Sequence, residues 1–502
     1  MRTSGCALAG AAMLSLVLAG CKPLPPVHYL PPQTGAQGCD EIITFGARLP
    51  FPEPVKSTNT GTQSVPAAAG EAAGDEADAA LQWESDPASD PVGQKLLKDL
   101  SAPLPTFEGM MQGPDADTRP PSESILILSG GSQQGAFGAG FMSAWKAHRG
   151  GTLPRFRMVT GISTGALQAT FAFLGDTETI VREYSIEQES ELLRAFVDGK
   201  FDQKPFRSAY NLWARGTIAQ LDPLRETLKE DLITHEIMEK VAIEAGMHGR
   251  TLQVGAVEMG SGELAVFDLG LAAILYMQNH ESDPARAEQF RMCYIEALIA
   301  SSSVPMSAAP VFIDNRLYID GGARFGVLAN LTATAYQQAA LKAQEEKRDS
   351  GAPRNLFVIV NATMEVPRFC GLSRCDLRED GTAIPPNPGD PHPDWNFLQL
   401  AQRSVSVMIN QAYRSSVFVA DKQGAKDKFR TQFVRLDPAH LQHKAAIEFP
   451  GAGPEAKICF DWQKDDAEID NPKEFFPRYM RCLIDYGRKH DKAKAFAAAE
   501  PK

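Results

Sequence analysis

The sequence predicts an α/β fold in which a mostly parallel central sheet carries helices on both faces. Three mainly apolar segments, 124–128, 156–160 and 356–360, are expected to form buried strands of this sheet. Strands that are buried on both faces lack the alternation of polar and apolar residues and occur in parallel sheets covered by helices. Segments with helical periodicity separate these strands, and such alternation favours the parallel arrangement.

The other expected elements continue this alternation along the chain. Two hairpins are expected, with strands at 252–257 and 263–267 and at 311–313 and 317–319. Asp314 and Asn315 form the turn signal of the second hairpin. Helices are expected at 166–174, 187–197, 223–228, 233–245, 285–299, 330–347, 394–420 and 472–497, and a further strand at 429–436.

Length, composition and charge limit the classes of function. The chain has 502 residues, of which 43% are hydrophobic, and this is sufficient for a large buried core. Its formal net charge is -12. Proteins that bind nucleic acid through a general electrostatic footprint carry a basic surface, so nucleic acid is not an expected partner.

The first 20 residues have the organisation of a signal peptide. Arg2 precedes an apolar run at 7–19 that is too short to span a bilayer. The Leu-Ala-Gly sequence before Cys21 resembles the lipobox of bacterial lipoproteins, which implies that Cys21 is lipidated and anchors the chain in the membrane. Lys22 is not the aspartate of an inner-membrane retention signal, so we expect the outer membrane. An ordinary signal peptide with an unrelated cysteine is the alternative.

Three further regions follow the signal peptide. Residues 21–121 are rich in proline, alanine, glycine and acidic residues, which predicts a flexible tether. Within it, 41–45 is a short apolar island that we expect to dock on the folded body. Residues 122–362 are expected to form the catalytic core, and 363–502 the C-terminal part of the same body, with long helices.

A serine between two glycines, in the sequence Gly161-Ile-Ser163-Thr-Gly165, follows the strand expected at 156–160. A Gly-x-Ser-x-Gly pattern at a strand-to-helix turn places the serine hydroxyl on a sharp turn at the top of a sheet. The first amides of the following helix then point toward the position of a reaction oxyanion. Ser163 is therefore the candidate nucleophile, and an ordinary strand-helix turn is the alternative.

A glycine-rich loop follows the strand expected at 124–128. It contains Gly130, Gly131, Ser132, Gln134 and Gly135, and such a loop can form an anion-binding nest. A phosphate loop would require lysine and then serine or threonine after the last glycine, and a dinucleotide fingerprint would require a different glycine spacing. An oxyanion hole for acyl transfer remains, and it is the interpretation that also uses the candidate nucleophile.

An acid and two glycines, Asp320, Gly321 and Gly322, follow the strand expected at 317–319. The glycines allow the backbone to pass close to another loop, so Asp320 is well placed for catalysis. A turn or helix-cap aspartate is the more frequent use of an Asp-Gly pair and is the alternative.

Cysteines and histidines give weaker indications. Cys370 with Cys375 is expected to close a local loop and Cys459 with Cys482 to form a second disulfide, while free thiols remain the alternative. The cysteine and histidine spacing does not indicate a metal site. Four histidines follow Asp320 and could complete a triad, but their neighbours favour solvated surface positions: His392, His440, His443 and His490.

Taken together, the glycine loop, the Gly-x-Ser-x-Gly turn and the Asp-Gly-Gly sequence resemble the patatin-like phospholipase family in order and approximate spacing. The resemblance implies a three-layer α/β sandwich and hydrolysis of acyl esters in lipids such as phospholipids, without a metal or other cofactor. It implies that Ser163 is the nucleophile and Asp320 its base. It also implies that the amides of Gly130, Gly131 and Ser132 form the oxyanion hole.

Two positions in the glycine loop depart from the family pattern. Gln134 stands where the family usually has arginine or lysine, and Ser132 where it commonly has a third glycine. Gln134 can donate a hydrogen bond but carries no charge, and charged donors bind anions about twice as strongly. The departure predicts lower activity or a different substrate. An acyltransferase with the same nucleophile and a catalytically weak scaffold lipoprotein are the alternative functions.

Overall fold

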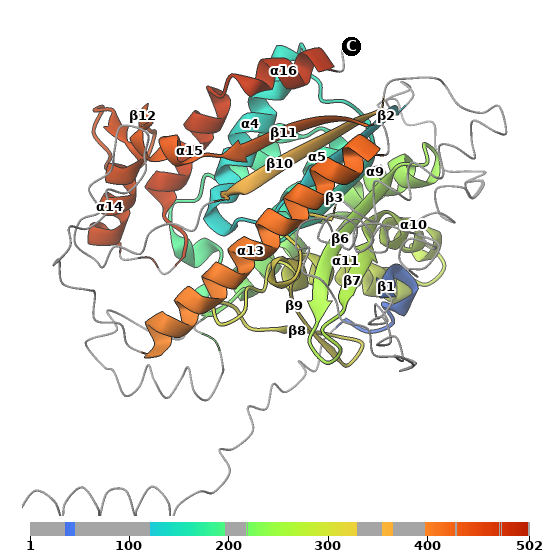
Figure 1. Cartoon of the computed structure of the whole chain (residues 1–502). Helices are drawn as coiled ribbons and strands as arrows, with labels where there is room; N and C mark the ends of the chain where they lie inside the picture. The colour runs from blue at the N-terminus through green and yellow to red at the C-terminus, as the bar shows by residue number, and fades with distance from the viewer. Residues whose placement is uncertain are drawn as a thin grey trace, which may run out of the picture.

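The computed structural model describes residues 36–45, 121–195, 217, 219–328, 354–364, 397–426, 429–470, 472 and 474–499 (Figure 1). Several predictions lie outside these residues: the signal peptide, Cys21, most of the tether, the helix at 330–347, the Cys370–Cys375 pair and His392. In the part of the chain that is described, no helix is both long and apolar enough to cross a bilayer.

A nine-stranded sheet forms the centre of the described body, and the expected α/β class is confirmed. Its main path runs β1-β7-β6-β3-β2-β10-β11, with β9 added beside β6 and β8 beside β9. The five strands from β6 to β11 are parallel, and the additions at the β6 end are antiparallel. The strands are β1 (Ile43–Phe45), β2 (Ser122–Leu128), β3 (Phe156–Ile162), β6 (Thr251–Glu258), β7 (Leu264–Asp268), β8 (Val311–Ile313), β9 (Arg316–Asp320), β10 (Asn355–Thr363) and β11 (Arg430–Leu436).

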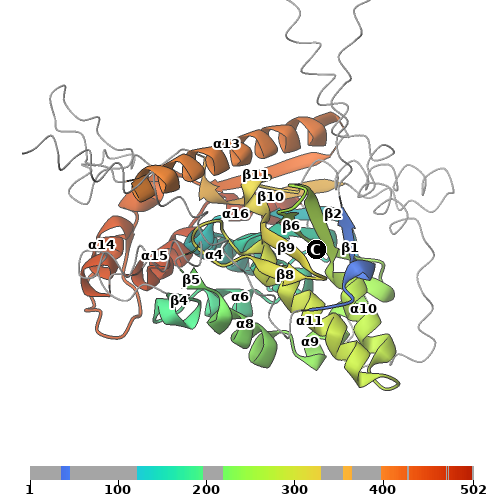
Figure 2. The same ribbon diagram turned by 90° about the horizontal axis from the view of Figure 1, so that it is seen from below.

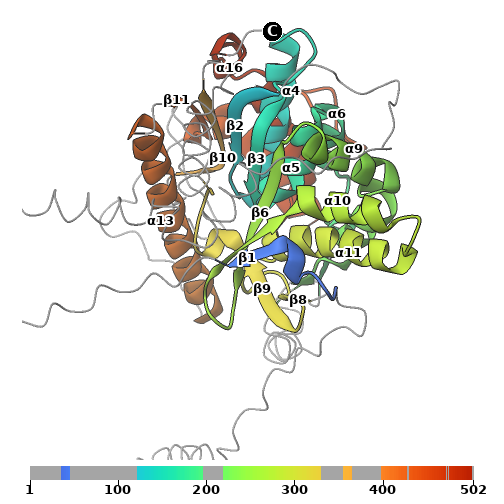
Figure 3. The ribbon, with the colours of Figure 1, turned by 90° about the vertical axis from the view of Figure 1, so that its right-hand side faces the viewer.

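Helices cover both faces of this sheet, as expected. Figures 2 and 3 show α13 on one side, and α4 and α5 with most other helices on the opposite side. The helices are α4 (Gly135–His148), α5 (Thr164–Leu174), α6 (Thr177–Glu183), α8 (Asp222–Thr227), α9 (His235–Gly246), α10 (Leu269–Asn279), α11 (Pro284–Ser301), α13 (Phe397–Lys426), α14 (Cys459–Ile469), α15 (Pro477–Arg488) and α16 (Lys492–Ala499).

Alternate residues of the central strands enter two separate cores. Ile125 and Ile127 of β2 pack in the cluster that contains Val417 of α13. Leu126 and Leu128, which alternate with these two residues along β2, pack in the larger cluster with residues of α4 and α5. Both faces of β2 are therefore buried from residue 125 to residue 128, which is why these four residues are all apolar.

The register of the parallel strands brings two loops together. Leu128, at the end of β2, pairs with Gly161 of β3, two residues before Ser163. The carboxyl ends of neighbouring parallel strands meet at one edge of a sheet, and ligand sites form there. The glycine loop after β2 and the serine turn after β3 therefore lie side by side.

Both predicted hairpins are present. Strands β6 and β7 pair antiparallel, and so do β8 and β9. Asp314 and Asn315 join β8 to β9, both with positive φ (48° and 60°), as a two-residue hairpin turn requires.

Two helix predictions are wrong in part. Instead of a helix, the segment 187–195 contains the short 3-10 helix η3 (Glu189–Glu191) and β4 (Arg194–Ala195), which pairs with β5 (Ala219–Gln220). Its pairing with a distant segment overrides the local helical preference. The helix expected at 472–497 is interrupted between α15 and α16, and the break allows Phe496 to pack on Trp145.

Two disulfides join described cysteines, so the free-thiol alternative is wrong for them. Cys459–Cys482 was expected, and Cys39–Cys293 was not among the nominated pairs. Strand β1 in the apolar island pairs with β7, at the edge of the sheet. The expected docking of the island is therefore present, and the Cys39–Cys293 disulfide links the residues before it to α11.

Candidate active site

Ser163 lies at the sharp turn between β3 and α5. Its backbone has φ 55° and ψ -127°, a combination that costs a non-glycine residue about 1–3 kcal/mol. Gly165 is required by a close approach, because a Cβ atom there would lie 2.4 Å from the carbonyl oxygen of Leu128. Gly161 is required in the same way, since its Cβ would lie 2.3 Å from the carbonyl oxygen of Gly165.

Ser301, at the end of α11, holds this turn in place. The Ser163 amide donates a hydrogen bond to Ser301 Oγ at 2.9 Å, and Ser301 Oγ donates to the Gly255 carbonyl at 2.7 Å. Both serines are buried. Sequence reasoning missed Ser301, because nothing near it in the chain distinguishes it from its neighbours Ser302 and Ser303.

Asp320, the last residue of β9, meets Ser163 although 157 positions of chain numbering separate them. The Ser163 hydroxyl lies beside the Asp320 carboxyl and is one of the hydrogen-bond donors that set its pKa. The Gly322 amide donates a hydrogen bond to Asp320 Oδ1 at 2.6 Å. Gly321 passes close to β6, since its Cβ would lie 2.5 Å from the Gly255 carbonyl oxygen. The structure therefore brings the two predicted catalytic residues into contact.

Burial changes the acidity of Asp320. Desolvation raises the pKa of its carboxyl from 3.8 to about 7, although the hydrogen bonds from Ser163 and the Gly322 amide lower it. The negative charge of Glu474 contributes a further increase in this pKa. A carboxyl with a pKa near 7 can both accept and return a proton at neutral pH, as a general base and acid must.

The glycine loop lies beside Ser163. A Cβ atom on Gly130 would lie 3.0 Å from the Cβ of Ser163. Gly131 and Ser132 both have positive φ (151° and 49°), and they turn the chain into η2 (Ser132–Gln134) and α4. Gly131 also contacts β10, since its Cβ would lie 2.8 Å from the Asn361 carbonyl oxygen.

Gln134 ends η2 and precedes α4, which begins at Gly135. Burial raises the pKa of the Tyr479 hydroxyl of α15, and the Gln134 side chain, as a neighbouring hydrogen-bond partner, lowers it. Gly135 allows α4 to approach α5 closely, since its Cβ would lie 2.1 Å from Thr164 Oγ1. The uncharged residue at position 134 therefore links the loop to the C-terminal part of the body.

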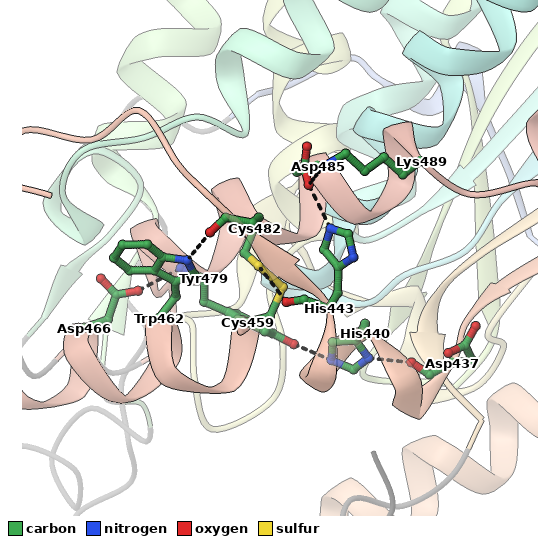
Figure 4. The surroundings of a disulfide bond; sticks show 11 residues. Asp437, His440, His443, Cys459, Trp462, Asp466, Tyr479, Cys482, Asp485 and Lys489 are labelled. Carbon is green, nitrogen blue, oxygen red and sulfur yellow. Dashed lines mark hydrogen bonds and ion pairs between the residues drawn. A yellow bond between two sulfur atoms is a disulfide. The ribbon is translucent and has the colours of Figure 1, made fainter. Parts of the chain in front are cut away.

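Two of the candidate histidines lie near the Cys459–Cys482 disulfide, with partners of their own (Figure 4). His440 Nε2 is 2.8 Å from the Tyr479 hydroxyl, and His443 Nε2 is 2.7 Å from Asp485 Oδ2. The expectation of a solvated surface position is wrong for His440, which is buried and whose pKa burial lowers to about 4. His443 and His490 are partly buried, and burial lowers the pKa of His490 as well.

A pocket opens at Ser163 and is mostly apolar. Ser132, Ser163 and Glu474 line it together with side chains from α5, α6 and the helical segment that follows β5. Two of its lining residues, Glu183 and Glu474, are acidic, and none of the described lining residues is basic. Six leucines supply much of the apolar wall: Leu167, Leu192, Leu221, Leu224, Leu228 and Leu232.

Two residues of the C-terminal part reach the site, and sequence reasoning missed both. The Tyr413 hydroxyl of α13 would lie 1.9 Å from a Cβ on Gly130 and 3.1 Å from one on Gly322. Burial, and then the charge of Asp320, raise the pKa of Tyr413. Glu474 accepts a hydrogen bond from Ser132 Oγ at 2.7 Å. Neither residue lies in a motif, so contact through the fold is the signal that identifies them.

Metal ligands do not converge in the described residues. No group of three or more His, Cys, Asp or Glu side chains there is placed to hold a metal ion. The groups that surround Ser163 are a carboxyl, a phenol hydroxyl and backbone amides, and these are suited to proton transfer and hydrogen bonding.

Comparison with known proteins identifies the central region. Residues 126–334 match the model of the patatin-like phospholipase family, and this is less than half of the chain. A search of curated proteins finds no match. The matched region contains Ser163, Asp320 and the glycine loop, so the resemblance of their motifs is confirmed at the level of the domain. Tyr413, Glu474 and Tyr479 lie outside it.

Proposed function

We propose that this chain, whose central domain matches patatin-like phospholipases, is a lipid acyl hydrolase that cleaves esters through an acyl-enzyme on Ser163. The family match supports a hydrolase with lipid substrates. The placement of the Ser163 hydroxyl beside the buried Asp320 carboxyl, as one of the donors that set its pKa, is the observation that supports the specific mechanism. A nucleophilic serine with a base within hydrogen-bond reach is the arrangement that covalent acyl transfer needs.

In the proposed first step, Asp320 accepts the proton of the Ser163 hydroxyl while its oxygen attacks the ester carbonyl. The carbonyl oxygen becomes an oxyanion, which receives hydrogen bonds from the amides of Gly130, Gly131 and Ser132. Collapse of this intermediate breaks the bond to the alcohol, which leaves with the proton from Asp320. Ser163 then carries the acyl group.

In the second step, water replaces the alcohol. Asp320 accepts a proton from the water as its oxygen attacks the acyl-enzyme, and the same amides receive the new oxyanion. Its collapse releases a fatty acid and returns the proton to Ser163. A pKa near 7 suits Asp320 for both directions of proton transfer.

The apolar pocket beside Ser163 supports a fatty acyl chain as the group transferred. Burial of a methylene group in such a pocket contributes about 0.8 kcal/mol. Leu192, Leu221, Leu224 and Leu228, which line this pocket, come from the segment between α6 and α9. Phospholipids and lysophospholipids are the proposed substrates.

The proposal extends to the location of the enzyme. Lipidation of Cys21 would anchor the body at the bacterial cell envelope, and the absence of aspartate after Cys21 favours the outer membrane. The support is the lipobox resemblance in the sequence. Metabolic labelling with an alkyne-bearing fatty acid tests this: we expect label on the full chain and none on a Cys21→Ser variant. Label that persists in the variant would contradict it.

Hydrolysis assays test the catalytic proposal. The full chain is incubated with p-nitrophenyl butyrate and with a short-chain phosphatidylcholine, and released fatty acid is measured. We expect Ser163→Ala to remove activity toward both, whereas Ser404→Ala, at an exposed serine of α13, retains it. Activity that survives in Ser163→Ala would contradict the proposal. Adding an alcohol acceptor and analysing the products distinguishes a hydrolase from a transferase.

A further inference from the structure

Glu474 is placed at the active-site pocket by a chain segment outside the matched domain. Three observations locate its carboxyl. It accepts a hydrogen bond from Ser132 Oγ in the glycine loop, it lines the pocket together with Ser163, and its charge raises the pKa of Asp320. Glu474 therefore faces the space in which an ester bound at Ser163 would lie.

The segment that carries Glu474 is held firmly. The amides of Glu474 and Phe475 both donate to Glu189 Oε1, at 2.6 and 2.9 Å. The next amide, of Phe476, donates to Gln133 Oε1 at 3.1 Å. These bonds join the segment to η3 on one side and to the glycine loop on the other. The position of the carboxyl is thus fixed by the fold before a substrate binds.

The charge around this carboxyl is unbalanced. Glu183 also lines the pocket, and none of the described lining residues is a lysine or arginine. Gln134, which precedes α4, is uncharged. Burial raises the pKa of Glu474, which means that a carboxylate at this position lacks compensation. A cation from a ligand would supply it.

We propose that Glu474 determines specificity for the alcohol part of the substrate. It favours acyl esters whose alcohol carries an ammonium group, such as zwitterionic phospholipids, over esters with an anionic head group. The ammonium pairs with the Glu474 carboxylate at the polar end of the pocket, while the acyl chain occupies the leucine-lined part. An anionic head group meets like charge and no counter-ion, and such juxtaposition is unfavourable. This inference rests on the proposed function.

Two phospholipids with identical short acyl chains test the inference. Diheptanoyl phosphatidylcholine and diheptanoyl phosphatidylglycerol are compared below their micelle concentrations, so that binding to a lipid surface does not contribute. We expect kcat/KM of the full-length protein to favour phosphatidylcholine by about tenfold or more. In Glu474→Gln, which keeps the shape of the side chain, the two values should come within about threefold of each other.

Matched variants separate charge from structure. Glu468→Gln removes one negative charge from the exposed face of α14 and should keep the preference of the unaltered protein. Ser132→Ala removes the hydrogen bond to Glu474 but leaves its charge, so the preference should persist even if both rates fall. Glu474→Asp should also favour phosphatidylcholine.

Three results would overturn the inference: an unchanged preference in Glu474→Gln, a preference of the unaltered protein for phosphatidylglycerol, or a loss of preference in Ser132→Ala as large as that in Glu474→Gln. The last result would mean that the preference depends on the position of the glycine loop and not on the charge of Glu474. A failure of the proposed function looks different, because neither phospholipid nor p-nitrophenyl butyrate would then be hydrolysed.

Discussion

The matched domain and the C-terminal part of the chain make different contributions to one site. Residues 126–334 supply the groups proposed to react, Ser163 and Asp320, together with the glycine loop. The C-terminal part supplies Tyr413 and Glu474, which surround those groups. In the proposed mechanism the first region determines the reaction type, whereas the pKa of Asp320 and the substrate preference depend on the second.

The second region is firmly attached to the first. Helix α15 packs on α4 at a crossing so close that a Cβ on Gly140 would lie 2.0 Å from the Ile484 carbonyl oxygen. Phe496 of α16 packs edge-on against Phe141, with 4.9 Å between the centres of the two rings. These contacts explain how residues so late in the chain keep fixed positions at the site.

Removal of each of the two disulfides should cause the largest losses of stability, and the two losses should differ. Cys39–Cys293 spans 254 positions and Cys459–Cys482 spans 23. In the loop-entropy account, removing the first costs about 5 kcal/mol of unfolding free energy and removing the second about 3 kcal/mol. Urea unfolding of the two paired Cys→Ser variants measures both. A larger loss from the shorter loop would contradict the account.

The same variants also address activity. Cys482 lies in α15, which carries Tyr479 next to Gln134, whereas Cys39 and Cys293 lie away from the pocket lining. We therefore expect kcat/KM to fall when Cys459–Cys482 is removed and to remain when Cys39–Cys293 is removed, both measured where the variants stay folded. The reverse pattern would contradict a role of α15 in supporting the active site.

Asp320→Asn should reduce ester hydrolysis by about a thousandfold or more, because the amide cannot accept the proton of Ser163.

Asp320→Asn should also stabilise the fold above pH 7. The folded protein keeps a proton on Asp320 between pH 3.8 and about 7, where the unfolded chain has lost it, so this group contributes less stability as pH rises through that window. Asparagine avoids the buried charge, and we expect a gain of about 4 kcal/mol at pH 8.

The stability gain is checked by urea unfolding of both proteins at pH 5 and pH 8. The gain should be larger at pH 8. An Asp320→Asn variant that is active would assign the base to another residue, and equal stability differences at the two pH values would contradict the raised pKa.

Ser301→Ala should weaken the turn without removing a reacting group. The buried amide of Ser163 and the carbonyl of Gly255 both lose their partner, which costs about 1–3 kcal/mol of unfolding free energy. We expect kcat to fall about tenfold through misplacement of the hydroxyl. Ser303→Ala is the control, because its Oγ donates to the Ile299 carbonyl at the end of α11, at 2.8 Å, and not to the serine turn. Equal effects of the two variants would refute the role of Ser301.

Tyr413→Phe should have the smallest effect. It tests whether the C-terminal part of the chain influences the pH dependence of activity, which the pKa of Asp320 in the matched domain determines. Activity should rise with pH to a plateau above about 7, because only the carboxylate form of Asp320 accepts a proton. Loss of the Tyr413 hydroxyl leaves this carboxylate in more apolar surroundings, so the midpoint should move upward by about 0.5 to 1 pH unit. The pH profile of kcat/KM measures it, and a midpoint that stays in place assigns Tyr413 a packing role only.

Local rules explain what the sequence could predict. The serine turn and the hairpin at Asp314 and Asn315 require particular backbone conformations, and few residue types satisfy them. The apolar strands follow from burial on both faces. These features depend on neighbours in the chain, and a single sequence contains that information.

Features that depend on distant contacts could not be predicted. The segment at 187–195 has helical preference but pairs as β4 with β5. His440 is buried and contacts Tyr479, which lies 39 positions later in the chain, and the residues near His440 in the sequence do not indicate this contact. Tyr413 and Glu474 lie in no motif. Their positions at the site follow from how α13 packs on the sheet and from the hydrogen bonds that hold the segment before α15.

Labelling by a fluorophosphonate tests the central claim most directly, because the reagent reacts with an activated serine independently of substrate choice. The account predicts label on the peptide that contains Ser163, and a labelling rate that falls at least about a hundredfold in Asp320→Asn. A folded protein without label at Ser163, or one labelled equally fast in Asp320→Asn, would contradict it.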